Sequence, residues 1–451
     1  MFAATSLLPD LGHRIALAHL MHNTSGIRDM LEIMRLGGAD LAQPCEPGDL
    51  LDGVCRQRGL NFVPGSRYLY SNSNFMLLGR IVEQVSGQSL REFLDRRIFA
   101  PLGMNATRHV ERTDEVVPGL ATGYAPARDG TWMRAQHNFP LHGEGGLVSS
   151  VADLALWHAN FASPRVGGTA LANALTTMTP FNNGRPNTYA RGLSIKLHRG
   201  VRTVGHEGLW PGYKTSFVRI PDHDAAVICI SNDTTSDPYD VAFQVVDALL
   251  EGKPGVHAVP PMPEIAKLPG RWLNRDTGAT VDVAIGKAGC ITASTHGVTV
   301  TTIPTADGGL ATNRVLADFT MRLGPDDVLE VERDAGACET LHRVAPGAKL
   351  PIDLPGRYVN ADTAAAWTIA QEEAGTTLHI VGPLRAAGPW EIEPVEGDFI
   401  RVISPMTLFR GSTSASCAMP AAELPVCASM AAARGTCCLR ASVDIPRMGT
   451  S

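Results

Sequence analysis

The stretch Pro64-Gly65-Ser66-Arg67-Tyr68-Leu69-Tyr70-Ser71-Asn72 ends just before a run of apolar residues at helical spacing, from Phe75 to Val85. Gly87 supplies a stop for that predicted helix. A tyrosine whose phenolate is stabilised by nearby cations can act as a general base. An asparagine two residues later can point its amide into the same cleft and hold a substrate amide. Tyr70 and Asn72 are therefore candidate catalytic residues.

A second short motif, His206-Glu207-Gly208, leads into a β-like run that starts at Tyr213. A histidine here can donate to a substrate carboxyl group or to the phenol. A glycine lets a substrate backbone lie against the strand. Each motif alone is common, and a buried tyrosine or a histidine in a turn is the more frequent origin of such a pattern. Only the combination makes His206 a candidate.

Capping patterns mark two further helices in the first 250 residues. Ser89-Leu90-Arg91-Glu92 is a capping box that opens one helix, and Pro101 is expected to end it. Ser150-Val151-Ala152-Asp153 opens the other, whose apolar residues share one face: Leu154, Trp157 and Phe161. This spacing predicts helices that pack one side against a core.

Two β-like runs, Tyr213–Ile220 and Ala225–Ser231, follow. The turn-like residues between them, Pro221-Asp222-His223-Asp224, predict an antiparallel hairpin. A closing helix is predicted over Val241–Leu250. Up to about Leu250 the chain therefore mixes helical and strand patterns.

An internal repeat begins after the linker Glu251–Pro263. Leu268-Pro269-Gly270-Arg271-Trp272-Leu273-Asn274-Arg275-Asp276-Thr277 recurs as Leu354-Pro355-Gly356-Arg357-Tyr358-Val359-Asn360-Ala361-Asp362-Thr363, with seven of ten positions identical and an offset of 86. Two copies at this spacing predict two related small β domains, over 264–348 and 350–411, because solenoid periods are shorter. Chance similarity between turn-rich segments is the alternative. The tail, 412–451, is atypical and rich in alanine and cysteine.

Length, charge and cysteine usage limit the class of protein. A chain of 451 residues with 44% hydrophobic content exceeds one core and excludes wholesale disorder. The net charge of −6, without a basic stripe, argues against nucleic acid as a partner. No apolar run approaches the ~18 residues of a membrane span, and the start lacks a signal-peptide pattern. Outside the tail the cysteines are scattered and odd in number, which argues against a disulfide framework. A cytoplasmic location without membrane contact is the expectation.

Other chemistries have weaker support. His13, His19 and His22 lie close in sequence but lack a Glu partner or a Cys pair, so satisfied or solvent-facing histidines are the preferred interpretation. Gly143-Glu144-Gly145-Gly146 lacks the lysine and the preceding strand of a phosphate loop. We expect neither a metal nor a cofactor.

A serine nucleophile is missing from the motifs. None of the six lysines has a serine three residues before it, so the sequence contains no Ser-x-x-Lys, and it contains no Gly-x-Ser-x-Gly elbow either. Ser25-Gly26-Ile27-Arg28 has the right spacing. Arginine stays protonated, however, and cannot act as the base.

Four segments occur in a fixed order: His19-Leu20-Met21-His22-Asn23-Thr24-Ser25-Gly26, the Pro64–Asn72 stretch, Gly145-Gly146-Leu147-Val148-Ser149-Ser150-Val151-Ala152-Asp153-Leu154, and His206-Glu207-Gly208-Leu209-Trp210-Pro211-Gly212-Tyr213. This ordered set resembles the serine β-lactamase and penicillin-binding-protein superfamily, in the branch around the class C enzymes. The His-x-Gly in place of Lys-Thr-Gly and the two repeated β domains resemble the D-stereospecific aminopeptidases. The resemblance covers roughly residues 8–410.

The resemblance implies an α/β (α+β) β-lactamase-like catalytic domain with an antiparallel sheet, over 1–252, followed by two small antiparallel β-barrel domains. In that family the serine of Ser-x-x-Lys attacks a carbonyl and forms an acyl-enzyme, which water hydrolyses. By motif, the catalytic residues would be Tyr70 as general-base partner, Asn72 as substrate-orienting amide and His206 at the third motif. Substrate binding would involve Gly208, Glu207 and Asn72. The β domains would narrow the cleft toward small substrates with a free N-terminus, such as D-Ala amides and short peptides.

The chain departs from the family at the nucleophile. The family's Ser-x-x-Lys lies roughly 90 residues before the tyrosine motif, which would fall ahead of Met1. We therefore expect the domain over 1–252 to be N-terminally incomplete and the chain as given to be inactive. A truncated or mis-started gene product is preferred over a retired enzyme whose cleft only binds, since losing a buried helix removes part of the core. The change after Arg410, with cysteines crowding from Cys417 to Cys438, is what a frameshift would give.

Three functions stay open from the sequence. The preferred one is a serine hydrolase of the aminopeptidase type that releases N-terminal D-residues from small peptides or amides. A related esterase or D-Ala-D-Ala carboxypeptidase shares every motif, and a non-catalytic binding protein would use the β domains. The expected partner is a small peptide or amide substrate, with homodimer formation left open.

Overall fold

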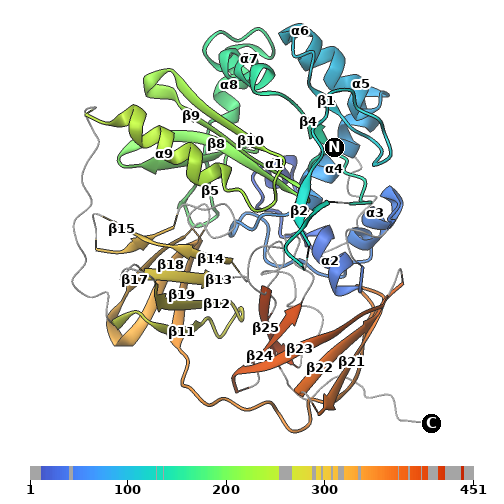
Figure 1. Cartoon of the computed structure of the whole chain (residues 1–451), viewed down its shortest axis with the longest axis vertical. Helices are drawn as coiled ribbons and strands as arrows, with labels where there is room; N and C mark the ends of the chain where they lie inside the picture. Colours follow the sequence, from blue (N-terminus) through green and yellow to red (C-terminus); the bar gives the residue numbers. More distant parts are fainter. Residues whose placement is uncertain are drawn as a thin grey trace.

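An antiparallel sheet in the order β10-β9-β8-β7 lies in the first half of the chain, in a computed structural model of the protein (Figure 1). Its strands are β7 (Ser194–His198), β8 (Val201–Trp210), β9 (Tyr213–Ile220) and β10 (Ala225–Ser231). The predicted hairpin is confirmed, since β9 and β10 pair in register from Ile220 with Ala225 to Lys214 with Ser231. The structure describes residues 12–39, 44–127, 129–135, 137–252, 267–286, 291–295, 298–305, 308–312, 319–333, 337–373, 375–383, 386–397, 399–404, 415–421 and 438–440.

Helices cover both faces of this sheet. On one face, α9 (Pro238–Leu250) buries Tyr239, Phe243 and Val246 against the side chains of Val218 and Ile220. On the other face lie α7 (Val151–Ala162) and α8 (Gly168–Leu175), whose Phe161 and Leu175 contact a buried cluster: Ala190, Leu193, Ile195 and Val204. Three short pairs of strands complete this half: β1 (Arg108–His109) with β4 (Leu147–Val148), β2 (Tyr124–Pro126) with β3 (Trp132–Arg134), and β5 (Thr179–Pro180) with β6 (Pro186–Asn187).

The N-terminal helices build a separate core beside the sheet. They are α1 (Leu17–Met21), α2 (Met30–Leu36), α3 (Pro47–Cys55) and α4 (Asn72–Ser86). Their apolar faces meet through a shared set of buried residues: Leu20, Met30, Ile33, Leu50, Val54, Met76 and Leu77. The predicted stop of α4 is confirmed, because Gly87 takes the left-handed conformation with φ 67°.

The helix that begins at Ser89 differs from the prediction at its end. Its capping box is present, with the Glu92 amide donating to Ser89 Oγ and the Ser89 amide donating to the Glu92 carboxylate. The expectation that Pro101 ends the helix was wrong, because α5 (Leu90–Leu94) continues through a π-helical turn (Asp95–Phe99) into α6 (Ala100–Leu102). Just before Pro101 the hydrogen bonds are π-helical, since the amide of Ala100 donates to the carbonyl of Asp95, five residues earlier. Gly103, with φ 76°, ends the helix instead.

Two largely antiparallel sheets follow the linker, whose residues 253–263 lie outside the described ones. The first sheet has the order β14-β13-β12-β11-β19-β18-β17-β16-β15. Its strands are β11 (Gly270–Leu273), β12 (Thr280–Ile285), β13 (Ile291–Thr295), β14 (Val298–Thr301), β15 (Ile303–Pro304), β16 (Leu310–Ala311), β17 (Phe319–Leu323), β18 (Val328–Arg333) and β19 (Ala337–Arg343). Each sheet has an apolar core, and that of the second sheet also includes Leu273 of β11 and Leu36 of α2.

The second sheet runs in the order β20-β21-β22-β23-β24-β25-β26. Its strands are β20 (Gly356–Asn360), β21 (Ala365–Glu372), β22 (Gly375–Val381), β23 (Ala386–Glu396), β24 (Phe399–Ser404), β25 (Ala415–Ala421) and β26 (Cys438–Arg440). Both β25 and β26 pair with β24, although they lie beyond the predicted boundary at 411. The rest of the tail, including most of the segment interpreted as frameshifted, lies outside the described residues.

The sequence repeat produces the same local structure twice. In the first copy the indole Nε1 of Trp272 donates to the carbonyl of Leu268 at 3.0 Å, and in the second the hydroxyl of Tyr358 donates to the carbonyl of Leu354 at 2.6 Å. Both copies then turn on an asparagine whose Oδ1 accepts the backbone N–H three residues later. The Trp/Tyr exchange therefore preserves one tether between the start of each copy and its first strand.

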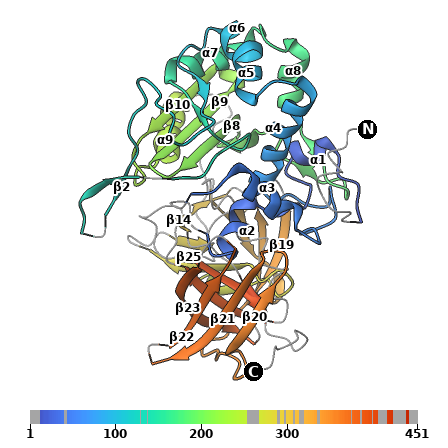
Figure 2. The ribbon, with the colours of Figure 1, turned by 90° about the vertical axis from the view of Figure 1, so that its right-hand side faces the viewer.

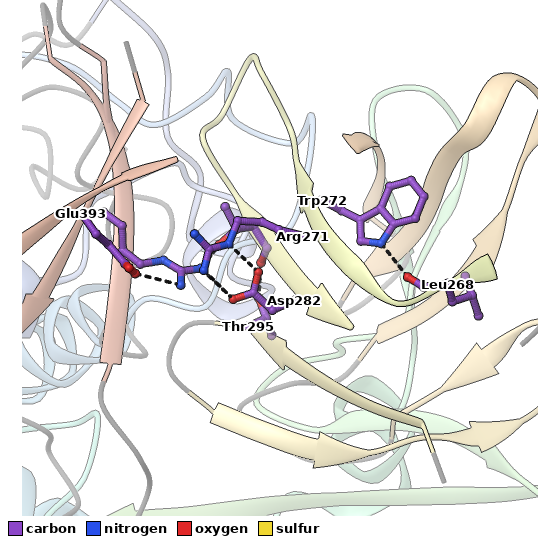
Figure 3. A network of polar contacts seen from close by, with 8 residues as sticks. Leu268, Arg271, Trp272, Asp282, Thr295 and Glu393 are labelled. Atoms are coloured by element: carbon purple, nitrogen blue, oxygen red, sulfur yellow. Dashed lines mark hydrogen bonds and ion pairs between the residues drawn. The ribbon is translucent and has the colours of Figure 1, made fainter. Parts of the chain in front are cut away.

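A buried arginine joins the two sheets. Arg401 on β24 donates to Asp282 on β12 at 3.0 Å and to Glu393 on β23 at 3.2 Å. Arg271 on β11 donates to the same Asp282 carboxylate at 2.8 Å (Figure 3). The guanidinium of Arg401 is thus shared between carboxylates of both sheets, which fixes one sheet against the other.

The second sheet also contacts the N-terminal helices, and Figure 2 shows α2 next to its strands. The indole Nε1 of Trp367 on β21 donates to the carbonyl of Leu36 at the end of α2, at 2.9 Å. Leu36 itself belongs to the apolar core of that sheet.

Among the helices of the described residues, none is long and apolar enough to cross a membrane.

Candidate active site

The Tyr70-Ser71-Asn72 motif forms the turn into α4, with Ser71 in an extended conformation at the N-cap. One carboxylate oxygen of Asp29 accepts both the backbone N–H of Asn72, at 2.6 Å, and its side-chain Nδ2, at 2.8 Å. The other oxygen of Asp29 caps α2 by accepting the amides of Leu31 and Glu32. Since Nδ2 and Oδ1 diverge from one carbon, Asn72 Oδ1 is directed away from the carboxylate.

A second set of contacts holds the same turn from the segment after α1. Asn23 is fully buried with φ 52°, and its Oδ1 accepts the amide of Ser71 and the Nδ2 of Asn74, at 3.2 and 2.7 Å. Ser25 Oγ donates to Asn74 Oδ1 at 2.6 Å. Ser25 also accepts the amide of Ile27 at 3.0 Å. This serine is fully buried, and its hydroxyl is bonded to Asn74 and to the amide of Ile27.

His206 lies in the middle of β8 and has a defined tautomer. Its Nδ1 lies 2.6 Å from the carbonyl of Glu207, which can only accept, so Nδ1 carries the proton. Its Nε2 lies 3.1 Å from Tyr189 Oη and therefore accepts from that phenol. Burial lowers the pKa of His206, and the ammonium of Lys196 lowers it further. The imidazole is accordingly neutral near pH 7.

The structure brings the rings of Tyr70 and His206 together, with the ring of Tyr189 beside both. The ring centroids of Tyr70 and His206 are 6.1 Å apart, and Tyr189 meets Tyr70 edge-on at 6.2 Å. Burial raises the pKa of Tyr189 well above its usual range, and the neighbouring Tyr70 raises it further. Tyr189 is therefore a protonated donor, and its proton is directed at His206.

The other two predicted binding residues lie on β8 beside His206. Successive side chains of a strand point to opposite faces, so Gly208 shares a face with His206 whereas Glu207 points to the other face. A Cβ atom at Gly208 would lie 2.5 Å from Thr215 Oγ1 on β9. Any side chain at position 208 would therefore displace that hydroxyl. The roles of Gly208 and Glu207 in substrate binding stay predictions.

Histidines near the N-terminus serve the structure. His22 Nδ1 lies 3.0 Å from the carbonyl of Tyr189, and its Nε2 lies 3.0 Å from Thr179 Oγ1. Both ring nitrogens thus bond to protein groups. Within the described ranges, no group of three or more histidine, cysteine, aspartate or glutamate side chains is arranged to hold a metal ion.

Sequence reasoning missed three residues of this site. Asn23 lies inside a quoted segment, but nothing there indicated that its amide would hold Ser71. Asp29 is a visible N-cap candidate before α2, yet its bond to Asn72 spans 43 positions. Tyr189 belongs to no motif, because its place beside His206 depends on how β7 and β8 pair with the preceding loop.

The arrangement can hold and transfer a proton. A protonated phenol, a neutral imidazole and a second phenol are adjacent, next to an amide that is fixed by a buried carboxylate. Such groups serve general acid–base steps and orient an amide substrate. None of them is a serine activated for attack.

The chain is similar to several known proteins. The chain is 27% identical over 406 residues to a D-aminopeptidase of Cereibacter sphaeroides, covering 85% of this chain and 72% of that protein. It is 26% identical over 365 residues to a D-aminopeptidase of Brucella anthropi, covering 80% and 67%. The octameric penicillin-binding protein homologue from Pyrococcus abyssi superposes with a TM-score of 0.49 and 23% identity, over 74% of this chain and 79% of that one.

A protein-family model also matches the first part of the chain. The model of the Beta-lactamase family matches residues 7–250, which is more than half of the chain. This span contains all four ordered segments, the sheet β10-β9-β8-β7 and the residues that converge around Tyr70 and His206. On that match, the chain belongs to the Beta-lactamase family of serine hydrolases.

Proposed function

We propose that this chain is built around a site that recognises small D-amino acid amides or peptides through their free N-terminal residue, as in a D-aminopeptidase. The observation that carries the proposal is the convergence of Tyr70 and His206, from segments 136 positions apart, next to an Asn72 fixed by Asp29. The D-aminopeptidases of Cereibacter sphaeroides and Brucella anthropi, each matched over most of this chain, support the substrate class.

In the proposed chemistry, Tyr70 and His206 supply acid–base steps of acyl transfer. Tyr189 keeps His206 in the tautomer whose Nε2 accepts, so the imidazole can take a proton that a phenol releases. Asn72 Oδ1, directed away from Asp29, accepts an N–H of the substrate. Gly208 would lie beside the substrate backbone on β8, with Thr215 Oγ1 in the space that a side chain at 208 would take. The nucleophile is assigned to no residue, because the sequence contains no Ser-x-x-Lys.

Ligand binding tests this proposal without requiring turnover. We expect the 451-residue chain to bind D-alaninamide more tightly than L-alaninamide in isothermal titration calorimetry. His206→Gln and Tyr70→Phe should each weaken the binding of the D-isomer. Tyr124→Phe, at an exposed position of β2, is the matched control and should bind as the unmodified chain does. Equal binding of both isomers, or none, would defeat the proposal.

Turnover tests the reaction itself. Where the reading frame extends upstream through a Ser-x-x-Lys, the extended chain should hydrolyse D-Ala p-nitroanilide, and Tyr70→Phe should lower the rate by roughly 10²–10⁴-fold. Preference for acyl-D-Ala-D-Ala over substrates with a free amine would replace the proposal by a carboxypeptidase. A folded chain that binds D-alaninamide without turnover in either form would assign it a binding role.

A further inference from the structure

The turn of the second repeat copy inserts a buried carboxylate between the N-terminal helices. Asp362 is 3% exposed, and its oxygens accept from Arg28 at 3.0 Å and from Arg58 at 2.8 Å. Its main-chain carbonyl accepts from the side chain of Gln57 at 3.1 Å. Arg28 also donates to Gln57 at 2.8 Å, so all three contacts form one network. Asp362 thus pairs with the buried Arg28 and with Arg58, both some 300 positions away in sequence.

The surroundings leave little freedom for this contact to move. Trp367, five residues after Asp362, donates to the carbonyl of Leu36 at the end of α2. A Cβ atom at Gly382 would lie 1.5 Å from the carbonyl oxygen of Gly37. Backbone therefore meets backbone on one side of the contact, while ion pairs fill the other. These contacts restrict how the second sheet can pack against the N-terminal helices.

Arg28 connects this interface directly to the motif at the start of α4. Its own carbonyl accepts from Ser73 Oγ at 2.7 Å. The next residue is Asp29, whose carboxylate holds the backbone and the side chain of Asn72. Displacing Arg28 would move the partners of Asn72 and of Ser73 at once.

The first repeat copy forms the same turn without the ion pairs that Asp362 makes in the second. Asp276 occupies the position of Asp362 in the repeat, and the preceding asparagine makes the same turn contact. Asp276 is nevertheless exposed, whereas Asp362 is buried. The carboxylate is therefore not needed to form the turn itself. What distinguishes the second copy is the pair of arginines that its carboxylate meets.

We propose that Asp362 is a positioning residue: through Arg28 and Asp29 it sets the orientation of Asn72, so the second C-terminal sheet is a working part of the site. The geometric part of this inference stands on the contacts above, whereas its meaning for ligand binding rests on the proposed function. The asymmetry between the two repeat copies supplies the control.

Residue-resolved hydrogen exchange by NMR tests the geometric part in the full chain. Asp362→Asn should speed exchange of the Asn72 amide at least tenfold, because its bond to Asp29 loosens. Asp276→Asn should leave that rate unchanged, and exchange at Val218 in β9 should stay slow in both variants. An unchanged Asn72 rate in Asp362→Asn, or equal acceleration in Asp276→Asn, would overturn the inference. Parallel acceleration at Val218 would also overturn it, because it would indicate global loosening.

Two further variants keep the test sharp if Asp362→Asn folds poorly. Asp362→Glu retains the charge and should restore most of the protection at Asn72. Arg58→Gln removes only the outer ion pair, since the Arg58 side chain is 71% exposed, and should leave Asn72 protected. Loss of protection in Arg58→Gln equal to that in Asp362→Asn would contradict a path through Arg28.

Ligand binding separates this inference from the proposed function. Asp362→Asn should weaken D-alaninamide binding, and Asp276→Asn should not. If Asn72 loses protection while no form of the chain binds the amide, the positioning role stands and the proposed function fails. If the unmodified chain binds D-alaninamide and Asp362→Asn changes neither binding nor exchange, the proposed function stands and the positioning role fails.

Discussion

Tyr189 Oη lies 3.1 Å from Nε2 of His206, and this bond decides which nitrogen of the imidazole is available. Because the other nitrogen donates to the Glu207 carbonyl, the phenol must donate to Nε2. A donor on Nε2 stabilises the neutral ring, since the protonated ring has no lone pair to offer. The bond therefore adds to the effect of burial, which already lowers the pKa of His206.

Tyr189→Phe should accordingly raise the pKa of His206. Losing one hydrogen bond of about 1 kcal/mol corresponds to a rise of roughly 0.5–1 pKa unit. NMR titration of the His206 ring protons measures it, with Tyr124→Phe as the control because that phenol is exposed. An unchanged or lower pKa in Tyr189→Phe would mean that the phenol does not donate to this ring.

Asp29 performs two tasks with one carboxylate, capping α2 and holding Asn72. Asp29→Ala should lower the free energy of unfolding by about 2–3 kcal/mol, combining a lost N-cap with an unpaired buried donor. Ser89→Ala removes an exposed cap with no second task and should lower it by about 1 kcal/mol. Urea denaturation compares the two variants. Equal losses would show that the bond to Asn72 contributes little.

The hydrogen bond between Tyr358 and Leu354 can be removed with less loss of volume than the matching bond between Trp272 and Leu268. Tyr358→Phe removes only the hydroxyl that bonds to the Leu354 carbonyl, and should lower the free energy of unfolding by about 1 kcal/mol. Trp272→Phe removes a tether and also volume from a fully buried site, so we expect a larger loss of about 2–4 kcal/mol. A Tyr358→Phe chain as stable as the original would mean that water replaces the bond.

Local patterns allowed much of this fold to be predicted. The capping box at Ser89, the stop at Gly87 and the hairpin around Asp224 each depend on neighbouring residues alone, and all three are confirmed. Pro101 was misjudged because a π-helical turn precedes it, next to Phe99 and Leu102, which are buried against Trp157 and Val166. Helix propensity predicts the end of a helix poorly where tertiary contacts determine its hydrogen-bonding pattern.

The site could be predicted only as far as its motifs reach. Tyr70 and His206 came from two short motifs, and their proximity followed from the resemblance. Tyr189, Asp29 and Asp362 act through partners 17 to 334 positions away, and no periodicity or motif records such pairs. The repeat gave the position of Asp362 but not its burial, because its exposed counterpart Asp276 has the same sequence context.

Buried histidines should make the protein sensitive to mild acid. His109 is 1% exposed, and burial lowers its pKa, only partly offset by nearby Glu111 and Glu83. The same direction holds for His22, His137, His142 and His206. A lowered pKa in the folded state means that the unfolded chain binds the proton first. The stabilising contribution is thus complete above about pH 6.5 and declines as the pH falls toward the folded-state value.

The contribution of one histidine can be isolated by difference. Burial raises the pKa of Glu144 and takes that of Glu32 to about 8, so these carboxyls change stability with pH in the opposite sense. The free energy of unfolding should therefore be measured at pH 7.5 and pH 5 for the original chain and for His109→Gln. We expect the loss on acidification to be smaller in His109→Gln, by at most about 1.4 kcal/mol for each unit of pKa shift removed. His13→Gln, at an exposed position, should show the loss of the original chain. If the two variants lose the same free energy, His109 takes up its proton as readily in the folded state as in the unfolded one.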